Sequence, residues 1–210
     1  LVEEILIEKS ATGRSAWIRL FDETSAALRF PIKKKSLTEA EILNLLSDAD
    51  PKTRKIAGKS LSEVLENNKR IFGMILNVIS RDRFIEDNKR GFIRIMSSRN
   101  LDNDVEDEVV DKLVNTVDKA MPKLTHRYYK WKANQFGKSK LDWWDRNAPL
   151  PRSSEKLIQW SEARDIILDS FASFHPEISN LAKLFFKNNW IDASLRKGKA
   201  SGAFAHPSVP

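Results

Sequence analysis

The chain has 210 residues, of which 41% are hydrophobic and 31% charged, with no cysteine and a formal net charge of +7. This composition excludes an intrinsically disordered chain, a disulfide framework and a thiolate metal site, and it is compatible with the cytoplasm, where we expect the protein. The longest mainly apolar stretch, 71–79, is far shorter than the roughly 18 to 20 residues that span a bilayer, so we expect no membrane partner.

The positive charge could attract phosphate backbones or acidic peptides. Acidic residues are interleaved with the basic ones, however, and Lys33-Lys34-Lys35 is the one run of three basic residues. Interleaved charges are typical of a solvated helical surface. We therefore expect no nucleic-acid partner, although a stand-alone basic helical module that binds through this surface stays open as an alternative function.

The N-terminal part begins with residues of helical type. Residues 1–9 read as the middle of a helix and contain no initiator methionine, so we expect further chain upstream of them. Ser36 followed by Glu39 is a capping-box pattern, which predicts a helix over 37–47. The stretch 30–35 lies between these elements and is expected to be a linker.

A long helix of about eight turns is predicted from Asp50 and Pro51 onward. Aspartate accepts hydrogen bonds from free N–H groups at a helix start, and proline in the first turn sacrifices no hydrogen bond there. Apolar residues then recur at intervals of three and four, which places them on one face of the helix. The series, which includes one polar residue, runs through Ala57, Leu61, Val64, Leu65, Asn68, Phe72, Ile75, Leu76 and Ile79. A loop is expected over 85–103.

The second half of the chain is predicted to be helical for similar reasons. Val105, Val109, Leu113 and Val117 recur every four residues and predict a helix over 104–120. The other predicted helices run from Pro122 to Gly137, from Ser153 or Ser154 to Phe174, and from Pro176 to Asn189.

The segment 141–151 contains Trp143-Trp144 and two prolines and is expected to form a rigid loop. Tryptophans near basic residues could stack on single-stranded nucleic acid, but aromatic residues that anchor helices and loops explain their spacing better. Asp142 and Asp145 flank the tryptophans, and paired carboxylates can carry acid–base catalysis. We favour a role for them in fixing the loop, together with Arg146.

Few residues of this chain fit a catalytic pattern. Helical zinc hydrolases need two histidines one turn apart and a glutamate base, and His126, His175 and His206 have no such neighbours. The sequence also lacks a phosphate-binding loop, a dinucleotide-binding motif and the serine motif G-x-S-x-G. We therefore assign no catalytic residue and no metal ligand to this chain.

The hydrophobic pattern changes near the C-terminus. Residues 201–206 alternate small and large side chains before Pro207, which predicts a short extended strand. Small residues would let another backbone approach this strand closely, as a substrate-facing edge requires.

Three segments of the second half occur in order: LDWWDRNAPL at 141–150, EARDIILDSFASFHPE at 162–177, and FFKNNWIDA at 185–193 running on to GKASGAFAHP at 198–207. Together they resemble bacterial oligoendopeptidase F, a zinc metallopeptidase of the thimet-oligopeptidase type. A further likeness near 97–110 extends the resemblance over most of the chain from about Gly13.

The resemblance implies a helical shell around a deep channel, with oligopeptides as substrates and zinc as the cofactor of the parent enzyme. The family's H-E-x-x-H motif would follow the present sequence, so the parent is expected to hydrolyse peptides with zinc-activated water while this chain alone is inactive. The substrate would pair by strand addition with a cleft-edge strand. The residues to which the resemblance gives this substrate-binding role are Ser201, Gly202, Ala203, Phe204, Ala205 and His206.

These observations predict an all-α fold, a multi-helix channel-wall domain with a short C-terminal extended strand. Three parts are expected: an N-terminal helical piece at 1–30, a helical body at 36–200, and a cleft-edge strand at 201–210 that leads into a catalytic core outside this sequence. The predicted function is a channel-wall portion of a zinc-dependent oligoendopeptidase. The alternatives are the basic binding or scaffold module and an inactive partner of a separate catalytic chain.

Overall fold

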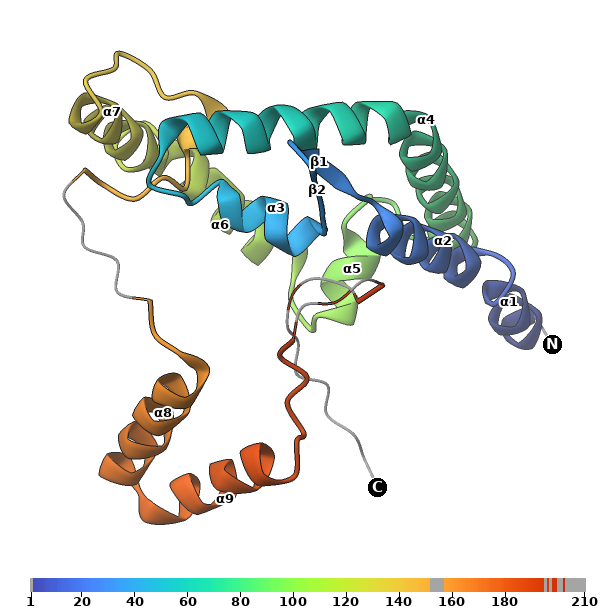
Figure 1. Cartoon of the computed structure of the whole chain (residues 1–210). Helices are drawn as coiled ribbons and strands as arrows, with labels where there is room; N and C mark the ends of the chain where they lie inside the picture. Colours follow the sequence, from blue (N-terminus) through green and yellow to red (C-terminus); the bar gives the residue numbers. More distant parts are fainter. Residues whose placement is uncertain (1, 152–156, 195, 197, 200–201, 203–210) are drawn as a thin grey trace. The chain divides into compact units, whose positions relative to one another are not determined.

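The structure is a computed structural model that describes residues 2–151, 157–194, 196, 198–199 and 202 (Figure 1). The described residues form helices and one two-stranded sheet, which confirms the predicted mainly helical fold class. They fall into two compact units, the first within residues 1–151 and 197–210 and the second within residues 152–196. The three-part division expected from the sequence stays a prediction.

The first unit begins with two helices, α1 (Val2–Ser10) and α2 (Arg14–Ala27). Helix α2 packs against the long helix α4 (Pro51–Lys89), where the rings of Phe21 and Phe72 meet edge to face at 5.6 Å. An exposed ion pair of 2.8 Å between Glu3 and Arg90 connects α1 to the residue that follows α4. These contacts place the N-terminal helices along the second half of α4.

Residues that the sequence assigned to a linker form a β-hairpin instead. Strands β1 (Phe30–Ile32) and β2 (Lys35–Leu37) pair antiparallel, with Phe30 opposite Leu37. The turn contains Lys33 at φ +54°, where a hairpin signal would ordinarily show glycine or asparagine. Strands of three residues are also too short to display a two-residue alternation, so the sequence carried no recognisable hairpin signal.

The next helix, α3 (Glu39–Leu45), starts two residues later than predicted. Its capping box joins Thr38 and Glu41, not Ser36 and Glu39: the Thr38 hydroxyl accepts from the Glu41 N–H at 3.4 Å, and the Glu41 carboxylate accepts from the Thr38 N–H at 2.7 Å. Ser36 lies in β2, paired opposite Pro31. Ser36 is therefore part of a strand and does not cap the helix.

Helix α4 is the longest element in Figure 1 and its start is as predicted. The Asp50 carboxylate accepts from the N–H groups of Lys52 at 3.0 Å and Thr53 at 3.2 Å. The helix continues to Lys89 and so includes residues that the sequence assigned to a loop. The hairpin and α3 pack on its first turns, and the core that they enclose is formed by Phe30, Ile42, Leu46 and Ala57.

The rest of the first unit contains α5 (Ser97–Asp102), α6 (Asp107–Ala120), α7 (Thr125–Gln135) and the single 3₁₀ turn η1 (Trp143–Asp145). Helix α5 occupies part of the predicted loop. Helix α7 begins after Pro122, not at it, and it ends before Gly137, whose φ of +66° fits the predicted terminating glycine. The turn η1 packs against α4.

The second unit is a helical hairpin of α8 (Trp160–Phe174) and α9 (Pro176–Lys187). The His175 ring nitrogen Nδ1 accepts from the N–H of Glu177 at 3.3 Å and caps α9, whose start at Pro176 is as predicted. The Ser179 hydroxyl donates to the carbonyl of Leu168 at 2.9 Å and links the two helices. Residues 157–159 are not helical, so the start predicted at 153–154 was too early; those two serines lie outside the described residues.

Candidate functional site

The predicted substrate-binding residues fall almost entirely outside the part of the chain that the structure describes. Only Gly202 is described; it is exposed and has a φ of +105°, which favours glycine. Ser201, Ala203, Phe204, Ala205 and His206 are not described. The extended strand and its substrate role therefore stay predictions.

The described residues of the first unit form a different candidate site, a pocket of about 720 Å³. Its walls come from α3, the first part of α4, α7 and the loop 139–147. Much of the lining is apolar and includes leucines of α3, of its C-cap and of α4, together with tryptophans of the loop: Leu43, Leu46, Leu61, Trp143 and Trp144. A pocket of this size and lining is typical of a binding site for small molecules or short peptide segments.

The tryptophans are fixed by a close approach between η1 and α4. Gly58 lies on the face of α4 beneath them, and a Cβ atom at this position would lie 3.0 Å from Trp144 Cβ and 3.2 Å from a ring carbon of Trp143. A side chain at this position would force the tryptophans to shift by a few tenths of an ångström, so glycine favours the close contact. The two indole rings then meet edge to face, with centroids 5.8 Å apart and planes at 65°.

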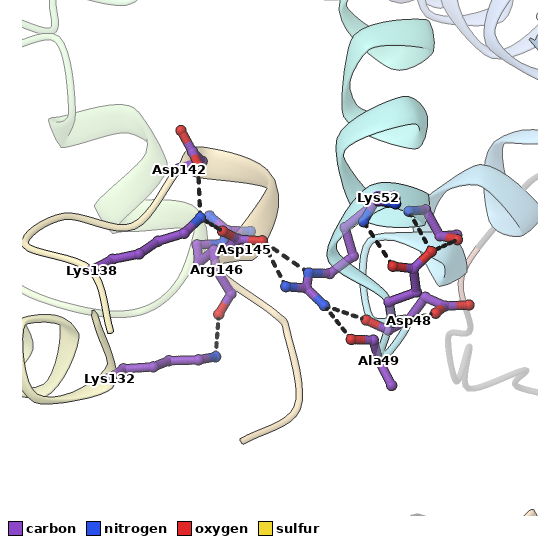
Figure 2. Close-up of polar contacts among 11 residues, drawn as sticks. Asp48, Ala49, Lys52, Lys132, Lys138, Asp142, Asp145 and Arg146 are labelled. Atoms are coloured by element: carbon purple, nitrogen blue, oxygen red, sulfur yellow. Dashed lines mark hydrogen bonds and ion pairs between the residues drawn. The ribbon is translucent and has the colours of Figure 1, made fainter. Parts of the chain in front are cut away.

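A buried ion pair fastens the same loop to α4 (Figure 2). Arg54 Nε donates to Asp145 Oδ1 at 2.9 Å, and both side chains are only 1% exposed. Arg54 Nη1 also donates to the carbonyl oxygens of Asp48 at 2.7 Å and Ala49 at 2.9 Å. One guanidinium therefore holds η1, α4 and the turn before α4 together.

A lysine completes the neutralisation of Asp145. Lys138 Nζ donates to Asp145 Oδ2 at 2.6 Å and to Asp142 Oδ2 at 2.9 Å (Figure 2). Burial alone would raise the pKa of Asp145, but the hydrogen bonds and charges of Lys138 and Arg54 outweigh it and lower that pKa. The hydrogen bonds to Asp145 and Asp142 raise the pKa of Lys138. The carboxylate of Asp145 is thus kept ionised and hydrogen-bonded.

A buried lysine also lies beside this pair. Lys132, on α7, is 4% exposed and donates from Nζ to the carbonyl oxygen of Arg146 at 2.7 Å (Figure 2). Burial lowers its pKa, and the positive charge of Arg54 lowers it further, while Asp145 opposes this. The lysine anchors α7 to the loop that carries the tryptophans.

The sequence identified part of this site. Asp142 and Asp145 were expected to fix the loop together with Arg146, and Asp145 does fix it, but its partners are Arg54 and Lys138. Arg54 was missed. It lies three residues before Ala57 and seven before Leu61, on the apolar face of the predicted helix, and a charged residue at such a position is the available signal for a buried ion pair.

His126 lines the pocket, although its neighbours in the sequence form no metal-ligand pattern. Within the described ranges, no group of three histidine, aspartate, glutamate or cysteine side chains could hold a metal ion. The same ranges contain no helix with the length and apolar character that a membrane crossing requires.

No family model matches the chain. The chain is 25% identical to the oligopeptidase PepF of Bacillus subtilis over 97% of its own length and 31% of that protein. It is also 25% identical to the group B oligopeptidase PepB of Streptococcus agalactiae, over 86% of the chain and 31% of that protein. The chain thus spans about a third of the length of the curated relatives it matches.

Solved structures show the same fold. The structure of PZ peptidase A superposes on 90% of this chain with a TM-score of 0.77 and 18% identity, and the match covers 34% of that protein. The oligoendopeptidase F of Enterococcus faecium gives a TM-score of 0.56 at 22% identity, over 80% of this chain and 34% of that protein. The resemblance to oligoendopeptidase F that the sequence indicated is confirmed.

Proposed function

We propose that this chain is a helical portion of a zinc-dependent oligoendopeptidase, which supplies part of the wall and of the substrate cleft of a longer protein. The observation that carries the proposal is the match to oligopeptidases along 97% of the chain. The helical fold shared with PZ peptidase A supports it. Oligopeptides are the substrates that this proposal implies, and the cytoplasm is the proposed location.

Zinc enters the proposal only through the resemblance. The described residues offer no group of side chains suited to a zinc ion, so they do not fit the cofactor by themselves. We assign the zinc ligands and the catalytic glutamate to a longer protein, and this chain is proposed to be inactive on its own. The role proposed for this chain is to hold the apolar pocket and the loop 139–147 in place through the ion pair of Arg54 and Asp145.

The test compares the 210-residue chain with a longer protein that contains it. Both are purified, their zinc content is measured by atomic absorption, and both are incubated with a quenched fluorescent oligopeptide. We expect zinc and cleavage only in the longer protein, and a chelator should abolish that cleavage. Cleavage by the 210-residue chain alone, or chelator-resistant cleavage by the longer protein, would contradict the proposal.

A stand-alone binding module is the second candidate function. The observation that favours it is the pocket itself, which forms entirely from described residues of the first unit. A module of this kind would bind ligands without the longer protein. Ligand binding by the isolated chain, together with no peptidase activity in any longer protein that contains it, would support this alternative.

A further inference from the structure

Positive charges outnumber negative ones around the pocket. Lys130, Lys140 and Arg146 line it, and none of their side chains has an ion-pair partner among the residues that the structure describes. Asp142 is the carboxylate among the described lining residues, and Lys138 holds it at 2.9 Å. The pocket thus presents several unpaired positive charges and an acid that is already neutralised.

The interior of the pocket has the opposite character. Leu43, Leu61, Trp143 and Trp144 all line it, and Leu43 remains 42% exposed and Trp143 50% exposed. A ligand that covers these side chains gains the free energy of apolar burial. A ligand that also carries carboxylates is attracted by the surrounding cations, and their electrostatic field steers its approach to the pocket.

From these two features we infer that the pocket binds a short peptide segment in which leucine-like side chains alternate with carboxylates. The inference deepens the proposed function and rests on it, because it takes the ligand to be a peptide. Apolar side chains would lie against the leucines and tryptophans, and the carboxylates would pair with Lys130, Lys140 and Arg146. The pocket volume of about 720 Å³ suits a segment of a few residues.

The geometry of the tryptophans favours a peptide over single-stranded nucleic acid. Bases stack on open aromatic faces. Here the two indoles pack edge to face on each other, and Trp144 is half-buried against the core beside Gly58. Leucine side chains, which offer no stacking plane, form much of the remaining apolar lining, together with Ala133, Tyr129 and His126.

The test measures fluorescence anisotropy with a labelled, end-blocked hexapeptide of alternating glutamate and leucine. Three further probes are a lysine–leucine hexapeptide, a glutamate–serine hexapeptide and a short oligothymidylate. We expect the glutamate–leucine peptide to bind at least about tenfold more tightly than each of the others, a difference of about 1.4 kcal/mol. Equal or tighter binding of any other probe, or no binding of the glutamate–leucine peptide, would overturn the inference.

Variants locate the binding. Lys140→Glu and Arg146→Glu are each expected to raise the Kd for the glutamate–leucine peptide by about three- to tenfold, which is about 0.6 to 1.4 kcal/mol. Lys34→Glu, at an exposed residue of the hairpin turn, makes the same change in net charge away from the pocket and should leave Kd within about twofold. Equal weakening by Lys34→Glu would overturn the inference. Thermal unfolding of each variant verifies that it is folded.

A variant of the apolar wall completes the test. Leu43→Ser changes an exposed lining residue and should raise the Kd for the same peptide by at least about threefold, because it removes apolar contact. Unchanged affinity would overturn the inference. Cleavage of oligopeptides by the longer protein is measured separately, so a pocket that fails to bind leaves the test of the proposed function intact.

Discussion

The start of α4 and the helical hairpin of α8 and α9 differ in how their side chains are covered. The first turns of α4 bury Arg54, Ala57, Gly58 and Ser60 under the β-hairpin, α3 and η1. In α8 and α9 the one buried residue is Ser179, while Phe174 is 82% exposed and Leu181 58% exposed among the described residues. Two helices alone cannot surround each other's apolar faces. A regular apolar pattern therefore indicates a helix without indicating which elements cover its apolar face.

Helix α6 makes the same point within the first unit. Its valines and leucine repeat every four residues, yet Val109, Leu113 and Val117 are all more than half exposed in the part of the chain that is described. The first turns of α4 combine apolar residues with an arginine and a glycine and are nevertheless the best-buried part of that helix. Burial therefore follows the neighbours that the fold supplies.

The largest expected effect comes from breaking the buried ion pair. Asp145→Asn leaves the Arg54 guanidinium buried without its counter-ion, which typically costs about 3–5 kcal/mol of unfolding free energy. Asp142→Asn is the matched control, because its pair with Lys138 is 49% and 37% exposed and should contribute at most about 1 kcal/mol. Urea unfolding followed by tryptophan fluorescence measures both. Similar losses in the two variants would refute the assignment of Asp145 as the structural anchor.

A second prediction contrasts two glycines of the same helix. Gly58→Ala would bring a methyl group within 3.0 Å of Trp144 Cβ, so we expect it to destabilise by about 1–3 kcal/mol. Gly73→Ala meets no atom within 4 Å and should stabilise by about 0.5–1 kcal/mol through the better helix propensity of alanine. Chemical denaturation measures the unfolding free energy of both variants, which should change in opposite directions. A stabilising Gly58→Ala would show that η1 does not approach α4 as described.

The ion pair also predicts a dependence on pH. The folded pKa of Asp145 is lowered below its unfolded value of about 3.9, so its contribution is present above that value and is lost as the pH falls through the folded pKa. The difference in unfolding free energy between wild type and Asp145→Asn should therefore shrink below about pH 4. Urea titrations at a series of pH values measure it, and a difference that stays constant at acid pH would contradict the explanation.

The smallest effect is expected on α6. Leu113→Gln replaces a side chain that is 62% exposed, so the unfolding free energy should change by no more than about 0.5 kcal/mol. The same change should reduce the fluorescence of a dye that binds exposed apolar surface, because it interrupts the apolar stripe of the helix. A loss comparable to that of Asp145→Asn would mean that α6 is covered after all.

Much of the fold followed from local signals. The cap at Asp50, the helix start at Pro176 and the glycine after α7 lie where the sequence predicted them. The hairpin at 30–37 did not, because its strands are short and its turn lacks glycine. The capping box predicted at Ser36 was wrong for the same reason, because Ser36 belongs to the second strand of the hairpin.

The candidate site was predictable only in part. Trp143 and Trp144 drew attention as a pair, and Asp145 was expected to hold their loop. The pocket between α3, α4 and α7 was not expected, because its lining residues come from segments that share no motif. Residues 201–206 remain a prediction from the resemblance to oligoendopeptidase F.

The sequence alone determined most of the helical segments, where several begin, and which face of each is apolar. These properties depend on residues within about one turn of each other, so the chain displays them locally. Only the tertiary structure decided that Arg54 meets Asp145 across 91 positions of sequence, and that Gly58 lies beneath Trp144. A charged side chain can be buried only where the fold brings an opposite charge next to it, and that proximity depends on the packing of several elements at once.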